Sequence, residues 1–221
     1  MIVTIDGPAG SGKSTVARWL ADRLDFEFLD TGALYRAVTF AAVDADVSPE
    51  DRTGLERLLS ALQIRRDHGR VWIGGKDRTE AIRTPQNTAR VGDYAELEVV
   101  RSFVNRLSHE LADGKNVVTE GRDQGTVVFP NAEIKFFVTA TDEERARRRL
   151  HQFVMHGSHV TFDQVLADQI KRDRRDSERA LAPLRKAADA EEIDTSGLEI
   201  DEVVDLLERR VHEKLQGGRG A

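Results

Sequence analysis

The feature that most constrains the fold of this chain stands almost at its first residue. An apolar run, Ile2–Asp6, is followed at once by Gly7-Pro8-Ala9-Gly10-Ser11-Gly12-Lys13-Ser14, which matches the pattern G-x-x-x-x-G-K-[ST]. In that pattern a strand leads into a glycine-rich loop, whose backbone N–H groups surround phosphate groups at the start of a helix. Val16, Leu20 and Leu24 follow at helical spacing. The sequence therefore predicts a strand, a phosphate loop and a helix that together bind a nucleoside triphosphate.

The composition argues against several classes of protein. The 221 residues suffice for one α/β domain with insertions, and the lack of cysteine excludes both disulfides and a cysteine-ligated metal. The net charge of −6 argues against general binding of nucleic acid or of a membrane surface. A strand that begins at Ile2 leaves no room for a cleavable signal, and no apolar stretch reaches the ~20 residues that span a bilayer. We expect a cytoplasmic monomer with neither nucleic-acid nor membrane partners.

Short apolar runs alternate with helical patterns along the chain. The runs typical of buried strands are Ile2–Asp6, Phe26–Asp30, Asn116–Thr119, Ile134–Thr139 and Glu192–Thr195. Apolar residues at helical spacing fill the intervals, most regularly from Tyr94 to Leu111 and from Ile200 to Leu215. The alternation predicts the α/β class, with three layers: a parallel five-stranded sheet and helices on both of its faces. We expect the Tyr94–Leu111 segment to be one helix.

Two regions interrupt this alternation. Residues from about 41 to 95 include Ile64–Gly75, a run typical of a hairpin with its turn near His68-Gly69, and predict an inserted lobe. Residues from about 148 to 180 include the loop Gln152–Thr161 between two arginine-bearing helices, and predict a hinged flap. Both belong to a single domain that spans residues 1–221, with its core in about 1–40, 112–150 and 180–221.

Polar residues stand at the carboxyl ends of the predicted strands, where open α/β sheets bind their ligands. Asp30-Thr31 ends the second strand, and Thr31 is placed to cap the helix that follows. The residues alone leave two roles open for it, this ordinary structural one and a functional one. The segment Glu120–Gly125 ends the third strand, and its two glycines, its arginine and its two acids favour function over a simple turn. We expect Ser14 to ligate Mg²⁺ directly, and Glu120, or as second choice Asp30, to orient it through water.

Basic residues gather between Arg145 and Arg179, although the chain as a whole is acidic. They are Arg145, Arg147, Arg148, Arg149, Lys171, Arg172, Arg174, Arg175 and Arg179. Arginines on a helix usually form a solvated face with acids nearby, as we expect of Arg174. Arg172, Arg175, Asp176 and Arg179 instead share a face by their spacing. Arg172 and Arg179 stand ~10 Å apart along the axis. The cluster predicts a local cationic surface for a compact anionic ligand.

Several of these segments, in this order and at this spacing, resemble bacterial cytidylate kinase. They are Asp6–Thr15, Leu29–Arg36, Gly121–Pro130, Glu143–Arg149 and Arg172–Leu184, and the resemblance runs from Met1 to about Thr195. The block G-R-D-x-G-T-V-V-F-P is specific to that family, whereas the phosphate loop marks many proteins. The resemblance implies a P-loop kinase fold. In that fold the insertion at about 41–95 binds a nucleoside monophosphate (NMP), and about 148–180 forms a short lid with an arginine-bearing helix.

The resemblance also implies roles for individual residues. ATP binding is implied for Gly7, Pro8, Ala9, Gly10, Ser11, Gly12, Lys13, Ser14, Thr15 and Arg149, and CMP binding for Thr31, Arg36, Arg101, Gly121, Arg122, Asp123, Arg172, Asp176 and Arg179. The implied catalytic residues are Lys13, Arg122, Arg148 and Arg179, and Arg83 is a weaker site candidate. The chain departs from the family at Gly92, where many relatives carry serine, and at Gln124, where isoleucine or methionine is more usual.

The motifs and the resemblance together predict transfer of the γ-phosphoryl group of ATP to CMP or dCMP, with Mg²⁺. No catalytic base is expected, because the second pKa of the acceptor phosphate is about 6 and the group is largely ionised at neutral pH. Three alternatives remain: a kinase that prefers UMP or AMP, another small-molecule kinase such as a shikimate kinase, and a regulatory GTP switch. The last would require an Asn-Lys-x-Asp motif, which the sequence lacks.

Overall fold

The computed structural model describes residues 1–67, 69–155, 157 and 159–217, which fall into two compact units. Met1–Leu29 and Ala112–Ala221 form the first unit, and Asp30–Leu111 forms the second. A five-stranded sheet has the order β2-β6-β1-β7-β8, from Glu27–Asp30, Val117–Gly121, Ile2–Asp6, Ile134–Thr139 and Glu191–Asp194. The pairs β1–β6, β1–β7 and β7–β8 are parallel. This sheet confirms the α/β class and all five predicted strands.

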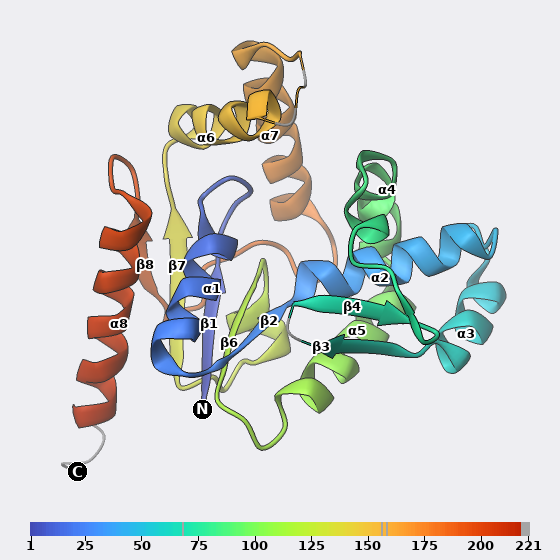
Figure 1. Ribbon diagram of the computed structural model, residues 1–221, viewed down its shortest axis with the longest axis horizontal. Coiled ribbons are helices and arrows are strands. Elements are labelled where there is room, and N and C mark those ends of the chain that lie inside the picture. The colour runs from blue at the N-terminus through green and yellow to red at the C-terminus, as the bar shows by residue number, and fades with distance from the viewer. Residues whose placement is uncertain (68, 156, 158, 218–221) are drawn as a thin grey trace. The chain divides into compact units, whose positions relative to one another are not determined.

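Helices α1 (Lys13–Leu24) and α8 (Ile200–Gly217) pack together over one face of this sheet (Figure 1). Val3 and Ile5 of β1 are fully buried there, in a cluster that includes Leu20 of α1 and Leu207 of α8. Burial of such side chains is the main favourable contribution to folding, at roughly 25 cal/mol for each Å² of apolar surface removed from water. The apolar spacing of both helices in the sequence therefore reflects this core.

The opposite face of the same sheet buries polar side chains. Thr4 and Asp6 alternate with the apolar residues of β1, and they are only 0% and 4% exposed. The carboxylate of Asp6 accepts the backbone N–H groups of Gln124 and Gly125, each at 2.8 Å. These two residues open a short π-helical turn, η2 (Gln124–Val128), and Thr119 of β6 donates to the Gln124 side chain at 3.0 Å. Hydrogen bonds thus fix a helical turn on this second face.

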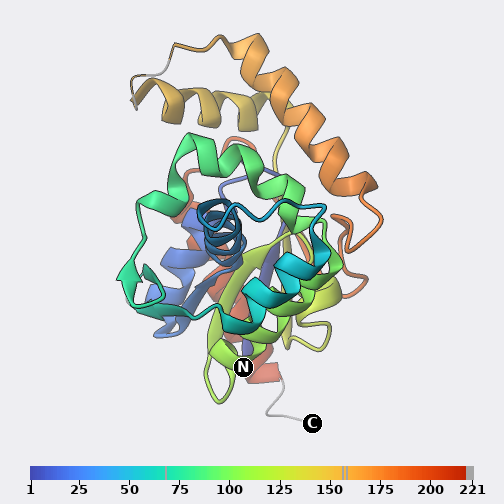
Figure 2. The ribbon, with the colours of Figure 1, turned by 90° about the vertical axis from the view of Figure 1, so that its right-hand side faces the viewer.

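Helices α6 (Asp142–Met155) and α7 (Phe162–Glu178) also belong to the first unit and pack against each other (Figure 2). Helix α6 continues to Met155, so the loop that was predicted to start at Gln152 begins later than expected. Residues 156 and 158 of the predicted loop lie outside the described part of the chain. Helix α7 begins at a capping box, in which Thr161 and Gln164 exchange side-chain and backbone hydrogen bonds. None of the helices that the structure describes is long and apolar enough to cross a membrane.

The second unit combines helices with a small antiparallel sheet. Its elements are α2 (Thr31–Asp44), α3 (Arg52–Ala61), β3 (Ile64–Asp67), β4 (Arg70–Ile73), β5 (Lys76–Asp77), the short helix η1 (Ala81–Arg83), α4 (Pro85–Ala95) and α5 (Glu98–Ala112). Strands β3 and β4 pair with Asp67 opposite Arg70, which confirms the hairpin. Gly69 lies in a turn between the two strands, and His68, the other residue of the predicted turn, lies outside the described residues. No pattern in the sequence predicted β5.

The single helix predicted from Tyr94 to Leu111 is wrong, because α4 ends at Ala95 and α5 begins at Glu98. Tyr94 is buried in a cluster with Ala42 and Leu55, and its hydroxyl donates to the carbonyl oxygen of Val47 at 2.8 Å. These contacts fix the end of α4 within the unit. The apolar spacing continues across the break, so periodicity alone could not reveal it.

The prediction that Thr31 caps the helix after β2 is also wrong. The cap of α2 is Asp30, whose side chain accepts the N–H of Ala33 at 2.8 Å, and Thr31 is the first residue of the helix. Both residue types are good caps, so the sequence pattern fits either one. The consequence is that a carboxylate, and not a hydroxyl, stands at this end of β2.

Burial raises the pKa of Asp6 from 3.8 to about 6, although the N–H groups of Gly125 and Gln124 act in the opposite direction. The folded protein therefore binds this proton more tightly than the unfolded chain does. The contribution of Asp6 to the free energy of unfolding should then grow by about 1 kcal/mol as the pH falls from 7 to 5. We expect Asp6→Asn to be less stable than wild type and to lack this dependence in urea unfolding at pH 5, 6 and 7. A difference between the two proteins that stays constant over this range would contradict the prediction.

Candidate functional site

The phosphate loop joins β1 to α1 as the sequence predicted. Gly7 has a φ of +153°, and a Cβ atom there would lie 2.0 Å from the carbonyl oxygen of Val138, so only glycine fits against β7. The hydroxyl of Ser11 donates to the carbonyl oxygen of Pro8 at 3.1 Å and closes the loop on itself. Within the part of the chain that the structure describes, no side chain caps α1. The N–H groups at the start of this helix are therefore left for the oxygen atoms of an anion.

The ammonium group of Lys13 is buried beside the loop. Its Nζ donates to the carbonyl oxygen of Pro8 at 3.1 Å and lies 3.9 Å from Oε2 of Glu120, which stands near the end of β6. Burial, and after it the positive charge of Arg122, lowers the pKa of Lys13 from 10.5 to about 7. A negative ligand next to Nζ would replace the hydration that burial removes. The structure thus brings together two predicted residues, Lys13 and Glu120.

Two ion pairs connect the segment after β6 with α7 and the residue that follows it. Nε of Arg122 lies 2.8 Å from Oδ2 of Asp176, and a terminal nitrogen of Arg179 lies 3.5 Å from Oδ1 of Asp123. Burial alone would raise the pKa of Asp176, but the charge of Arg122, with help from Arg172 and Arg179, holds it below its usual value. All five are predicted CMP-binding residues. Arg179 stands directly after the last residue of α7, where it serves as the C-cap.

The predicted cationic surface does not include Arg145. This side chain is buried, and its guanidinium group donates to the carbonyl oxygens of Ala140 at 3.1 Å and Ala9 at 2.7 Å. It also pairs with Asp142 and Asp173. A guanidinium group that is neutralised and hydrogen-bonded within the protein is not available to a ligand, so the sequence pattern misassigned this residue.

The other arginines of the cluster have different surroundings. Arg148 pairs with Glu144 at 3.0 Å and donates to the carbonyl oxygen of Thr195 at 2.7 Å. Arg149 lies over the ring of Phe153, with 4.8 Å between the guanidinium carbon and the ring centre. Arg174 is exposed and pairs with Glu178 at 2.9 Å, which confirms it as part of a solvated face. Arg148 lies near Gly12 of the phosphate loop, because a Cβ atom on Gly12 would be 3.7 Å from the Arg148 guanidinium group.

The remaining predicted residues lie in the second unit. Arg36 and Arg83 each place a terminal nitrogen 3.4 Å from Oδ2 of Asp30. The carboxylate of Asp30, the second choice for the metal, therefore already serves two guanidinium groups and the helix cap. Arg101 is buried and lies over the ring of Tyr35 at 5.7 Å. Thr31, in the first turn of α2, is buried as well.

Sequence reasoning missed three residues that hold the first unit's site together, namely Asp6, Arg145 and Asp173. Asp6 carried a usable signal, since it is an acid that ends an apolar strand, as Asp30 does. Asp173 carried none, because it is one acid among many charges on α7 and its partners are distant in sequence. The local sequence of Arg145 does not distinguish it from the solvated arginines around it.

The oxygen atoms near the loop fit a divalent cation that arrives with a nucleotide. In the described residues no group of three or more His, Cys, Asp or Glu side chains could hold a metal ion. Magnesium in nucleotide sites keeps several waters and takes one or two protein oxygens in addition to those of the phosphates. Ser14 is exposed at the start of α1, and Glu120 is paired with Lys13. These two residues supply hard oxygen donors of the required kind.

Comparison with known proteins identifies the family of this chain. The family model described as "Cytidylate kinase" matches residues 3–213. Proteins named cytidylate kinase from Carboxydothermus hydrogenoformans and Geobacter sulfurreducens are 47% and 44% identical to this chain; the matches cover 94% and 100% of it, and 95% and 97% of those proteins.

Among solved structures, an uncharacterized protein from Eubacterium ventriosum matches 96% of this chain and 98% of its own, with a TM-score of 0.56. At 14% identity this likeness supports the fold alone. The sequence matches extend over nearly the whole chain. The chain therefore belongs to the cytidylate kinase family.

Proposed function

We propose that this chain transfers the γ-phosphoryl group of ATP to CMP or dCMP, giving ADP and the cytidine diphosphate. As a member of the cytidylate kinase family it is a phosphotransferase, and the relatives that carry this name match it over nearly its full length. The observation that carries the proposal is the charge arrangement of the first unit. Lys13 beside the phosphate loop feels the charges of Arg122 and Arg172, and Glu120 and Asp176 balance them only in part.

The donor is assigned to the phosphate loop, Gly7–Thr15, together with Arg149. The unpaired N–H groups at the start of α1 are suited to phosphate oxygens, and Lys13 can exchange the carbonyl oxygen of Pro8 for the β- and γ-phosphates. Magnesium, when bound with ATP, supplies positive charge at these oxygens. Ser14 would hold it directly and Glu120 through water.

Transfer to an acceptor that is itself a phosphate requires positioning and charge neutralisation, and no base. Arg122 and Arg179 are assigned to the acceptor side, and Arg148 to the transferring group, which carries the charge that develops in the transition state. The ion pairs of Arg122 with Asp176 and of Arg179 with Asp123 fix both guanidinium groups before any ligand arrives. A preorganised charge of this kind does not have to reorient during the reaction.

The acceptor base is assigned to Asp123. Cytosine presents an amino group at N4, whereas uracil presents a carbonyl oxygen at O4, so a carboxylate that faces this edge favours CMP over UMP. Gly92, which lies in α4, offers no side chain for a further hydrogen bond to the base. Selectivity would therefore depend mainly on Asp123. Thr31, Arg36 and Arg101 are assigned to CMP as well, with Gly121, Arg172 and Asp176.

The test of this function is an assay of ADP release with ATP, Mg²⁺ and each of CMP, dCMP, UMP, AMP and shikimate. We expect turnover with CMP and dCMP. Arg148→Ala should lower kcat by about 10³-fold, as for other arginines that act on a transferred phosphoryl group. Arg174→Ala is the matched control, because that arginine is exposed and pairs with Glu178 along its own helix. Turnover with another acceptor and none with CMP would overturn the proposal.

The two candidate carboxylates for Mg²⁺ can be separated by substitution. Glu120→Gln should raise the Mg²⁺ concentration that gives half the maximal rate, because the amide is a weaker partner for metal-bound water. Asp30→Asn should raise it less, since Asp30 already serves Ala33, Arg36 and Arg83. The measurement is a Mg²⁺ titration of the initial rate at saturating ATP. An unchanged titration for Glu120→Gln would remove Glu120 from the metal site.

Asp123→Ala tests how the base is read. The substitution should reduce the ratio of kcat/KM for CMP to that for UMP by about tenfold to a hundredfold, the usual value of one hydrogen-bond contact to a base edge. The kcat/KM values for CMP and UMP are measured in the same assay, so that a general loss of activity cancels in their ratio. A variant that keeps the wild-type preference would show that another residue reads the cytosine.

A further inference from the structure

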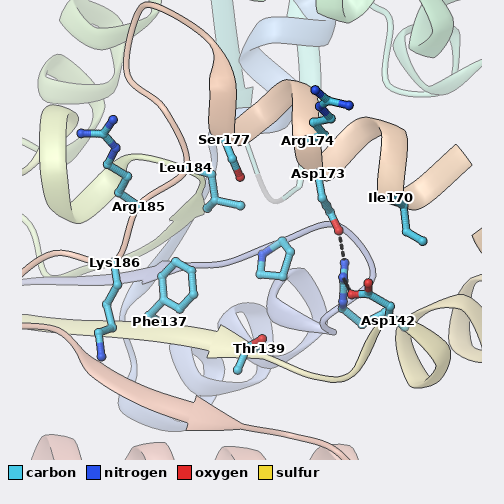
Figure 3. A pocket seen from close by; sticks show the side chains of 12 residues that line it. Phe137, Thr139, Asp142, Ile170, Asp173, Arg174, Ser177, Leu184, Arg185 and Lys186 are labelled. Carbon is cyan, nitrogen blue, oxygen red and sulfur yellow. Dashed lines mark hydrogen bonds and ion pairs between the residues drawn. The ribbon is translucent and has the colours of Figure 1, made fainter. Parts of the chain in front are cut away.

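A clasp of two side chains holds the phosphate loop against helices α6 and α7. Oδ1 of Asp173 on α7 accepts the backbone N–H of Ala9 at 3.2 Å, and Arg145 on α6 donates to the carbonyl oxygen of Ala9 at 2.7 Å. The other oxygen of Asp173 pairs with Arg145 (Figure 3, dashed line). Both backbone polar groups of one loop residue are thus satisfied by side chains from two different helices.

The loop also packs closely against the clasp. A Cβ atom on Gly10 would lie 2.9 Å from Oε1 of Gln169 on α7 and 3.1 Å from the carbonyl oxygen of Arg145 on α6. The side-chain amide of Gln169 in turn donates to the carbonyl oxygen of Asp142 at 3.3 Å. These contacts join the loop, α6 and α7 in a closed set, so that a shift of either helix strains the hydrogen bonds at Ala9.

Asp173 makes these contacts at the edge of a cavity of about 420 Å³ (Figure 3). Phe137, Ser177 and Leu184 are among the residues that line it. Both carboxylate oxygens of Asp173 are engaged by Ala9 and Arg145 and are not free for a molecule in this space. The geometry therefore favours an internal role for Asp173 over a role in binding a ligand there.

The clasp residues stand three positions before residues assigned to the reaction. Arg148 follows Arg145 on α6, and Asp176, the partner of Arg122, follows Asp173 on α7. Residues three apart on a helix are neighbours on its surface. Whatever fixes Arg145 and Asp173 on the phosphate loop therefore also fixes where Arg148 and the Asp176–Arg122 pair stand relative to that loop.

We propose that Arg145 and Asp173 are positioning residues for phosphoryl transfer. They hold the phosphate loop in a fixed position relative to the arginines of α6 and α7. The inference rests on the proposed function, and it deepens the role of the same site. In this account Ala9 anchors the loop, because its N–H is directed at Asp173, and the other N–H groups of the loop bind the phosphates. Arg145 and Asp173 act through the loop and through their own helices, without contact with a nucleotide.

The inference predicts a split between kcat and KM. Asp173→Ala should lower kcat by about 100-fold, the effect of misplacing reacting groups by roughly 1 Å, and should change KM for ATP and CMP only a few-fold. Asp173→Asn keeps an oxygen atom for the N–H of Ala9 but loses the negative charge that pairs with Arg145. Its kcat should therefore lie between that of wild type and that of Asp173→Ala. Asp142→Ala is the matched control, because Asp142 is a second carboxylate paired with Arg145 and is half exposed. Among the residues that the structure describes, its side chain makes no hydrogen bond to the loop. Asp142→Ala should keep the wild-type kcat.

Hydrogen exchange of the Ala9 amide, followed by NMR of the full chain without nucleotide, gives a readout independent of activity. Exchange should be faster in Asp173→Ala and unchanged in Asp142→Ala. Equal kcat values for Asp173→Ala and Asp142→Ala, or equal exchange rates of the Ala9 amide in these two variants, would overturn the proposal. If Asp173→Ala does not fold, Asp173→Asn is compared with Asp142→Ala in the same way. A wild-type protein that makes no cytidine diphosphate would overturn the proposed function, while the exchange at Ala9 still tests the clasp.

Discussion

Positive charge held close together at the carboxyl edge of one sheet is the feature on which the rest of this structure depends. Lys13 is buried, and burial is the main cause of its lowered pKa; the positive charges of Arg122 and Arg172 lower it further. Glu120 and Asp176 oppose these two charges in part. The phosphates of two nucleotides would add negative charge beside these groups. Positive groups that are already in place can stabilise a highly charged transition state without reorienting.

The parallel topology explains why the acids are where they are. The strands β1, β2 and β6 end in or near Asp6, Asp30 and Glu120, and each carboxylate has taken a different task. Asp6 accepts two N–H groups of η2 and so fixes the turn that follows Arg122 and Asp123. Asp30 caps α2 and gathers Arg36 and Arg83. Glu120 lies beside Lys13. The same sequence pattern, an acid at or near the end of an apolar strand, thus makes three different sets of contacts.

Most of the fold could be predicted from the sequence, because its signals are local. The five strands, the phosphate loop and helices α1 and α8 follow from apolar runs, glycine spacing and helical periodicity. The break between α4 and α5 could not be predicted, since Tyr94 ends α4 through contacts with residues distant in sequence, such as Val47. The clasp was hidden for the same reason. Arg145 has the local sequence of a solvated arginine, and only its distant partners Ala9 and Asp173 distinguish it from Arg174. The position of the phosphate loop could be predicted from its motif, and the residues that contact the loop from other helices could not.

The central claim is that one anionic donor and one anionic acceptor are held at the same time over this edge, with their phosphates meeting beside Lys13. Calorimetric titration with a bisubstrate analogue, in which adenosine and cytidine are joined through five phosphates, tests it most directly. We expect a stoichiometry of one, an affinity well above that of ADP or CMP alone, and loss of binding when either ATP or CMP is in excess. Binding that only one of the two nucleotides displaces, or an affinity no better than that of ADP, would contradict it.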